Sequence, residues 1–88
     1  MVKCENAMVY QNTIFENNDG IVCSNGHPLI DQNQIYNNKS NGIIIMGQSN
    51  VKIMYNVIKD NDGVGLFIRD KSRSTVLQNQ VTFLKRLN

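Results

Sequence analysis

Residues 30–45 read IDQNQIYNNKSNGIII, and this stretch contains the features that decide the fold. Aliphatic residues alternate with polar ones in short runs, and Asn or Gly interrupts each run after a few positions. Period-two alternation of β-branched side chains is typical of short strands with one buried face. A helix would need apolar residues at steps of three and four over at least about ten residues, which the Asn and Gly positions interrupt. The stretch therefore predicts short strands joined by tight bends.

The same pattern occurs once before this stretch and once after it. Residues 9–23 read VYQNTIFENNDGIVC, and residues 53–68 read IMYNVIKDNDGVGLFI. Aligning these three stretches with a partial fourth repeat at residues 76–81 places asparagine at spacings of 21, 23 and 23 residues. So many coordinated columns do not arise by chance in a chain of this length. The polar and glycine columns are Asn12, Asn33, Asn56 and Asn79; Asn17, Asn38 and Asn61; and Gly20, Gly42 and Gly65. The apolar columns are Val9, Ile30, Ile53 and Val76; Ile14, Ile35, Ile58 and Val81; Ile21, Ile43 and Leu66; and Cys23, Ile45 and Ile68.

This repeat predicts a parallel β-helix with one coil in every 21–23 residues. A β-meander also has short strands, but it does not require identical side chains at the same place in each repeat. A solenoid that rises by about 4.8 Å in each circuit does require them, because each residue then lies over its copies. We expect an all-β chain with a single domain over residues 1–88, built as about three to three and a half coils. The expected coils span about residues 7–27, 28–49 and 50–72, with a partial coil at 73–88.

The asparagine and glycine columns have distinct expected roles. Asn tolerates the left-handed conformation that a sharp turn needs, and its amide both donates hydrogen bonds to, and accepts them from, the Asn residues above and below. The glycine column is expected at a second bend, where a positive φ or a close backbone approach excludes a Cβ. We therefore expect a ladder of asparagines along the axis and a parallel file of glycines.

At this level of detail the sequence resembles a known family. The run Asn33-Gln34-Ile35-Tyr36-Asn37-Asn38 leading to Gly42-Ile43-Ile44-Ile45, and the linker Gly26-His27-Pro28-Leu29-Ile30, resemble right-handed parallel β-helix repeats. Such repeats occur in carbohydrate-binding proteins and sugar hydrolases, and these look most similar to those of F-box proteins of the ubiquitin system. The resemblance covers roughly residues 2–83 and implies a right-handed solenoid of the pectate-lyase-like kind. Pectin lyases, polygalacturonases, periplasmic copper-loading proteins and ubiquitin-ligase adaptors share this fold, so it does not fix a function.

Composition and charge exclude several classes of partner. The chain carries 9 basic and 7 acidic residues, a net charge of +2, which is too balanced to steer it to nucleic acid or a membrane. No apolar run approaches the roughly 18 residues that span a bilayer, and the first ten residues do not resemble a secretory signal. An intracellular location is therefore favoured. Cys23 falls on an apolar column and is expected to be a buried free thiol, which with Cys4 and His27 supplies too few ligands for a metal site. No cofactor is expected.

Catalytic candidates are few. Glu16 and Asp60 share the position four residues after the ladder asparagine, two coils apart, and so about 9–10 Å from one another. That separation is close to the spacing of the two carboxyl groups in inverting glycosidases. An outward column is usually solvated, however, and these coils have almost no inserted loops to form a cleft. Asp19, Asp62 and Asp70 are expected to serve turns. The sequence thus favours a protein without catalytic activity over an enzyme.

The outward wall is the better candidate for function. Phe15, Tyr36 and Lys59 share one column, and exposed aromatic residues on a flat sheet stack on sugar rings or anchor a peptide. The sequence favours a non-catalytic recognition or scaffold segment that binds protein partners, with a polysaccharide-binding or carbohydrate-active segment as the alternative. In that alternative Glu16 and Asp60 join Phe15 and Tyr36 at the site.

Both ends of the predicted solenoid lack an obvious cap. Uncapped ends expose apolar side chains and unpaired strand groups. We expect either continuation in a longer solenoid or end-to-end stacking of two chains. A partial cap is expected from Phe83, Leu84 and Leu87.

Overall fold

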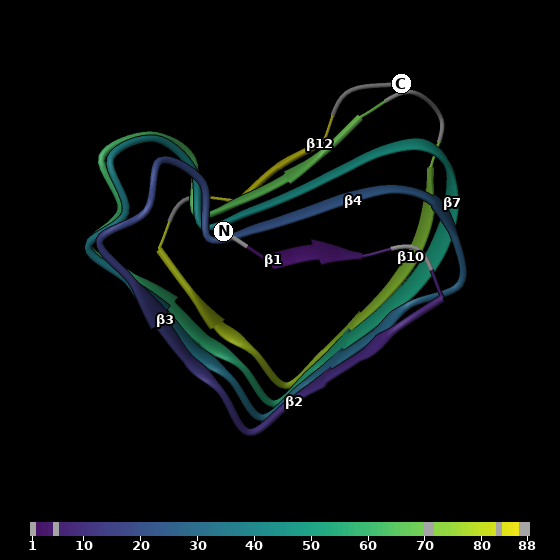
Figure 1. Cartoon of the computed structure of the whole chain (residues 1–88), viewed down its shortest axis with the longest axis horizontal. Coiled ribbons are helices and arrows are strands. Elements are labelled where there is room, and N and C mark those ends of the chain that lie inside the picture. The colour runs from purple at the N-terminus through teal and green to yellow at the C-terminus, as the bar shows by residue number, and fades with distance from the viewer. Residues whose placement is uncertain (1, 5, 70–71, 83, 87–88) are drawn as a thin grey trace.

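The fold is a stack of parallel strands that winds around a closed core. The structure is a computed structural model and describes residues 2–4, 6–69, 72–82 and 84–86. Viewed end-on, successive coils superimpose on one three-sided outline (Figure 1). The strands are β1 (Val2–Cys4), β2 (Met8–Tyr10), β3 (Thr13–Phe15), β4 (Ile21–Gly26), β5 (Leu29–Asp31), β6 (Gln34–Tyr36), β7 (Ile43–Met54), β8 (Val57–Lys59), β9 (Leu66–Ile68), β10 (Arg73–Leu77), β11 (Gln80–Val81) and β12 (Leu84–Arg86).

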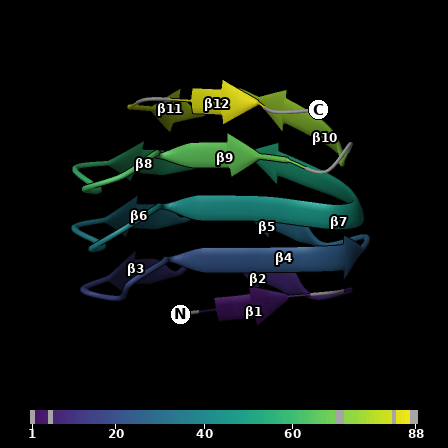
Figure 2. The same ribbon diagram turned by 90° about the horizontal axis from the view of Figure 1, so that it is seen from above.

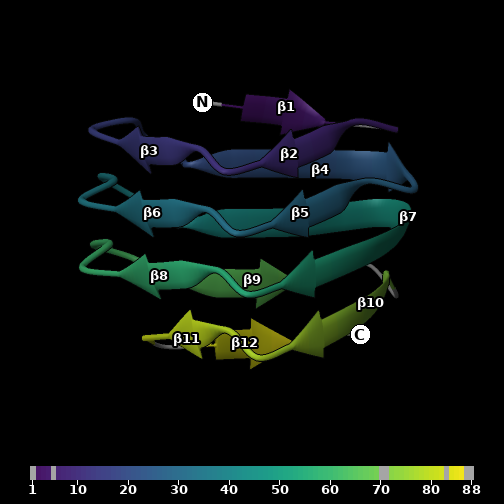
Figure 3. The ribbon, with the colours of Figure 1, turned by 90° about the horizontal axis from the view of Figure 1, so that it is seen from below.

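Each side of the outline is a parallel sheet whose strands come from successive coils. Sheet A contains β1, β4, the first part of β7, β9 and β12; sheet B contains β2, β5, the last part of β7 and β10; and sheet C contains β3, β6, β8 and β11. Figure 2 shows the layers of the stack, and Figure 3 shows sheets B and C side by side on the opposite side. Strand β7 belongs to two sheets because it runs without a break around the corner between sheets A and B.

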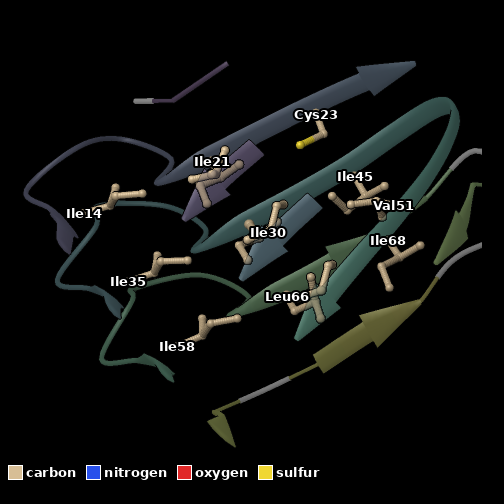
Figure 4. Close-up of a cluster of buried hydrophobic side chains, with 13 residues drawn as sticks. Ile14, Ile21, Cys23, Ile30, Ile35, Ile45, Val51, Ile58, Leu66 and Ile68 are labelled. Carbon is tan, nitrogen blue, oxygen red and sulfur yellow. The ribbon is translucent and has the colours of Figure 1, made fainter. Parts of the chain in front are cut away.

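Like residues lie over like residues in every sheet. Ile14 is aligned with Ile35, and Ile35 with Ile58, while Ile30 is aligned with Ile53. The inward columns form one core (Figure 4), in which most of the isoleucines have no accessible surface. Burying one such side chain stabilises a fold by about 1.5–3 kcal/mol. The repeating aliphatic columns therefore supply the main driving force, and the predicted all-β parallel solenoid of about three turns is confirmed.

The asparagine ladder runs inside the corner between sheets B and C. The backbone N–H of Asn33 donates to Oδ1 of Asn56 (2.8 Å), and the N–H of Asn56 donates to Oδ1 of Asn79 (2.8 Å). The Asn12 N–H donates to Oδ1 of Asn33 in the same way (2.9 Å). A second file at the next corner repeats the arrangement, since the Asn38 N–H donates to Oδ1 of Asn61 (3.0 Å). These amides satisfy turn donors that would otherwise be buried without partners.

The left-handed turn residue, however, is not the ladder asparagine, so that part of the expectation was wrong. Positive φ values belong to the residue immediately before each one: Gln11, Gln32, Tyr55 and Gln78, and in the second file Glu16, Asn37 and Asp60. The physical reason is that two neighbouring residues have different roles in each turn. A left-handed residue turns the chain, and the following asparagine can then point inward to reach the neighbouring coil. Asn33 and Asn56 are each only 1% exposed in consequence.

Glycine is required at its column because the coils approach closely. A Cβ on Gly42 would lie 2.5 Å from the carbonyl oxygen of Gly65 and 2.7 Å from Cγ2 of Ile58. A Cβ on Gly20 would meet Gly42 and Ile35 in the same way. The glycines with positive φ are instead Gly26 and Gly47. Of the two expected reasons for the column, close approach is therefore the one that applies.

Cys23 is not a free thiol, and that expectation was wrong. It is disulfide-bonded and buried. The other cysteine of the chain, Cys4, is aligned with Cys23 across β1 and β4. Stacking brings equivalent residues one strand apart, a separation within the usual Cα range of disulfides. The apolar column in the sequence did not reveal this disulfide, because the other members of the column are isoleucines.

Within the described part of the chain, strands at the two ends of the stack have one edge without a partner strand. Strands β2 and β3 each pair on one side alone, as do β10 and β11. Strand β12 continues sheet A beyond β9, with Leu84 aligned to Leu66. Phe83, Leu87 and Asp70 lie outside the described residues. Continuation in a longer solenoid and end-to-end stacking both stay predictions.

Candidate recognition wall

The predicted binding residues lie together on the outer face of sheet C. Phe15 on β3 is aligned with Tyr36 on β6, and Tyr36 with Lys59 on β8. The burial pattern of each strand alternates, so these residues point away from the core while Ile14, or its equivalent, points inward. The rings of Phe15 and Tyr36 stack with centroids 5.4 Å apart and planes inclined by 6°.

This ring stack changes what the column offers to a ligand. A sugar ring binds on the open face of an aromatic side chain. Phe15 and Tyr36 form a parallel stack with centroids 5.4 Å apart, so each ring covers part of one face of the other. The pair therefore does not offer two fully open ring faces side by side as a platform for a sugar chain.

The two candidate carboxylates occupy the turn that follows this column. Glu16 and Asp60 have φ values of 59° and 55°, and both side chains are exposed. The N–H of Glu16 donates to the carbonyl oxygen of Asn37 (3.2 Å), and the N–H of Asn37 donates to that of Asp60 (3.0 Å). Asn37 thus lies between them, which leaves Glu16 and Asp60 two strand spacings apart, about 9–10 Å. The left-handed turn alone accounts for a small polar residue at Asp60 and Asn37.

Exposed apolar residues extend the same surface onto sheet B. Among the residues whose side chains are described, the exposed large apolar ones, by 41–63%, are Met8, Tyr10, Phe15, Tyr55 and Leu77. All of them belong to sheets B and C or to the turn that joins these sheets, which Figure 3 shows side by side. We use the name recognition wall for the joined outer faces of sheets B and C, including Met8, Tyr10, Phe15, Tyr36, Tyr55, Lys59 and Leu77.

Sheet A has a different outer surface. Its outward apolar column, Val22, Ile44 and Phe67, is half-buried, and the guanidinium carbon of Arg69 lies 5.9 Å from the ring centroid of Phe67. Cations in this position are attracted to the ring face and shield it from water. Sheet A therefore offers less open apolar surface than the recognition wall.

A further polar file was missed by the sequence analysis. Oδ1 of Asp19 accepts hydrogen bonds from the backbone N–H (3.1 Å) and side-chain amide (3.2 Å) of Asn41. Oδ1 of Asn41 in turn accepts from the N–H of Val64 (2.8 Å). All three residues immediately precede a column glycine, so counting backward from the glycines would have found this file. It gives Asp19 the structural role in a turn that was expected of it.

Two absences apply to the part of the chain that the structure describes. Within residues 6–69 and 72–82, no three His, Cys, Asp or Glu side chains converge to hold a metal ion. No described helix is long and apolar enough to cross a membrane.

Comparison with known proteins supports the architecture. The family model for a right-handed beta helix region matches residues 1–83. The chain belongs to this family. No curated protein and no solved structure matches the chain significantly. The right-handed β-helix is therefore established, whereas the predicted likeness to F-box or carbohydrate-active members stays a prediction.

Proposed function

We propose that this β-helix is a non-catalytic recognition segment that binds a protein partner along the recognition wall. The observation that carries the proposal is the location of the exposed large apolar residues: among residues 6–69 and 72–82 they lie on sheets B and C or their connecting turn. Interface cores are enriched in Tyr, Phe and Met, and this surface has the same composition. Exposed apolar side chains that gather on one face of a protein commonly mark an interaction site.

The rigidity of the wall supports the same function. The outward residues lie on strands, or in the case of Tyr55 on the turn between two strands, and their neighbours are fixed by the inward core and by the asparagine file. A surface that is ordered before binding loses little conformational entropy on association. Tyr10 and Tyr55 also have few rotatable bonds, so they contribute contact area at a low entropic cost.

The alternative is binding or cleavage of polysaccharide, with Glu16 and Asp60 beside Phe15 and Tyr36. The stack between the two rings counts against a two-ring sugar platform. The left-handed turn position of Asp60 gives this residue a structural explanation that does not involve catalysis. The protein-binding proposal requires neither a cleft nor a metal.

The proposal is tested by selecting binders from a displayed library of random peptides with the immobilised β-helix. Selected peptides should bind a Tyr10→Ser, Tyr55→Ser double variant at least about 10-fold more weakly, as expected when interface anchors are removed. A Val22→Thr variant on the outer face of sheet A is the matched control and should bind them normally. Peptides that bind all three proteins equally would refute the wall as the site.

The same proteins are then titrated with soluble polygalacturonate, pectin and xylan. The protein-binding proposal predicts no saturable heat of binding and no release of reducing ends. Saturable binding that a Glu16→Ala, Asp60→Ala variant abolishes would establish the polysaccharide alternative in its place.

A further inference from the structure

One outward column of the recognition wall contains an aspartate among mainly apolar residues. At the end of sheet B the aligned residues are Tyr10, Asp31, Met54 and Leu77, one from each coil. Three of the four have large, mainly apolar side chains, and Tyr10 and Leu77 are exposed. Asp31 is the single charged group in this column, at the second of its four levels. An acid here interrupts what would otherwise be a continuous apolar stripe.

Asp31 is half-buried, and one oxygen of its carboxylate is unsatisfied. Its Oδ1 is buried and has no hydrogen-bond partner. The backbone of Asp31 is not the cause, because its carbonyl oxygen accepts the N–H of Gln11 (3.2 Å). Asp19 shows the usual arrangement, since its Oδ1 accepts two bonds from Asn41. A buried carboxylate oxygen without a donor destabilises the fold, so such groups are rare and call for a specific explanation.

The nearest cation on the outer face of sheet B does not pair with Oδ1 of Asp31. Lys52 lies on the same outer face, but it is aligned with Leu29, one diagonal step from Asp31. The structure shows no ion pair between Asp31 and Lys52, and Oδ1 stays without a donor. The side chain of Lys52 points outward from β7 and is exposed to solvent. Oδ1 is covered by the chain itself, so a donor from outside the chain would reach the other carboxylate oxygen, Oδ2, which is not buried.

We propose that Asp31 is the specificity-determining residue of the recognition wall, and that it binds an Arg or Lys side chain on a partner polypeptide. This inference rests on the proposed function. Residues that lower the stability of a free protein at an exposed, otherwise apolar surface are expected where binding requires them. Apolar neighbours exclude water, which strengthens a charge-assisted hydrogen bond to the carboxylate. The partner segment then carries one basic residue flanked by apolar residues that pack on Tyr10 and Met54.

Other ligands fit Asp31 less well. A divalent cation needs several oxygen ligands, and no cluster of acidic, His or Cys side chains occurs among the residues with described side chains. A phosphate or nucleic acid would be repelled by the carboxylate. A guanidinium or ammonium group on an apolar peptide satisfies both the charge and its surroundings.

The test compares peptides selected from the random library by the wild-type chain, by Asp31→Asn and by Asp62→Asn. Asp62 lies in an exposed turn outside the wall, so Asp62→Asn controls for the change in net charge. Wild type and Asp62→Asn should both select peptides in which Arg or Lys is flanked by apolar residues. Asp31→Asn should select apolar peptides without this basic residue. Equal enrichment of basic residues with all three proteins would overturn the inference.

Synthetic peptides then give the size of the effect. A wild-type-selected peptide should bind Asp31→Asn about 10-fold or more weakly, the loss expected for a hydrogen bond to a charged group. Replacing its basic residue by Met should weaken binding to wild type but not to Asp31→Asn. If binding requires Tyr10 and Tyr55 but is unaffected by Asp31→Asn, the inference fails while the proposed function stands. If no selected peptide depends on Tyr10 and Tyr55, the proposed function itself fails.

Thermal unfolding supplies an independent readout. Asp31→Leu completes the apolar column and removes the unsatisfied oxygen, so Tm should rise by about 4 °C or more for a domain of this size. The same variant should lose the preference for basic peptides. A fall in Tm would show that Asp31 stabilises the free chain and would overturn the inference.

Discussion

Side chains that point into the solenoid repeat from coil to coil, whereas those on the recognition wall do not. The inward column on sheet C is Ile14, Ile35 and Ile58, and the outward column beside it is Phe15, Tyr36 and Lys59. Both columns belong to the same three strands and have the same register. Backbone geometry is therefore not what makes them differ.

The difference shows which positions the fold itself constrains. An inward residue packs against its own copies one strand away, so a change in volume at one level is felt at the next. An outward residue meets solvent on one side and tolerates replacement. The chemical variety of the wall, including Asp31 in an apolar column, is thus available for recognition. The following experiments measure how sharply the inside and the outside differ.

The largest effect is expected inside the corner between sheets B and C. Asn56→Ala removes the acceptor for the N–H and the side-chain amide of Asn33 and the donor to the carbonyl of Ile30. Leaving these buried groups unpaired should lower the free energy of unfolding by about 4 kcal/mol, measured by urea denaturation. Asn18→Ala changes an exposed asparagine outside the ladder and should cost less than about 0.5 kcal/mol. Equal losses would remove the distinction between inside and outside.

The glycine column is expected to be the next most sensitive site. Gly42→Ala places a Cβ 2.5 Å from the carbonyl oxygen of Gly65, so adjacent coils must separate. The free energy of unfolding should fall by about 2 kcal/mol, as in other overpacked interiors. Urea denaturation of the variant measures the loss. A variant as stable as the wild type would show that adjacent coils can separate at Gly42 without loss of free energy of unfolding.

On the wall, the stacked rings should contribute a smaller coupling. A double-mutant cycle with Phe15→Ala and Tyr36→Ala should give an interaction energy of about 1 kcal/mol, because the rings are in contact. A second cycle with Phe15→Ala and Lys59→Ala spans two coils and should give a value near zero. If the two cycles agree, the stack does not stabilise the wall.

The smallest expected effect is a difference in stability between substitutions in a turn and in a strand on the outside of one coil. Gln32 has a φ of 57°, whereas Gln34 lies in β6 two residues later, and both side chains are exposed. Gln32→Gly should be neutral or slightly stabilising, because glycine adopts positive φ freely, while Gln34→Gly should lose about 0.5–1 kcal/mol. Thermal unfolding of the matched pair measures the difference. The reverse order would place the left-handed turn at another residue.

Sequence periodicity predicted the architecture because stacking forces equal residues onto one axial line. The alternation around Ile35 specified strands, and the repeated asparagines specified the coil length. The same logic placed Phe15, Tyr36 and Lys59 on one outward column, and the strand register aligns these three residues. It did not predict the disulfide bond of Cys23, because the repeats that follow have isoleucine in that column. It also missed the role of Asn41, whose equivalents in the neighbouring coils are Asp19 and Val64.

By itself, the sequence determined that this chain is a β-solenoid and which residues face its axis, because the repeat distance and the alternation of side chains are local properties. The tertiary structure alone decided which residue of each turn is left-handed, why glycine is needed, and that the rings of Phe15 and Tyr36 cover one another. It also decided that Asp31 has an oxygen without a donor. These properties depend on distances between coils, which arise when residues 21–23 positions apart are brought to one strand spacing.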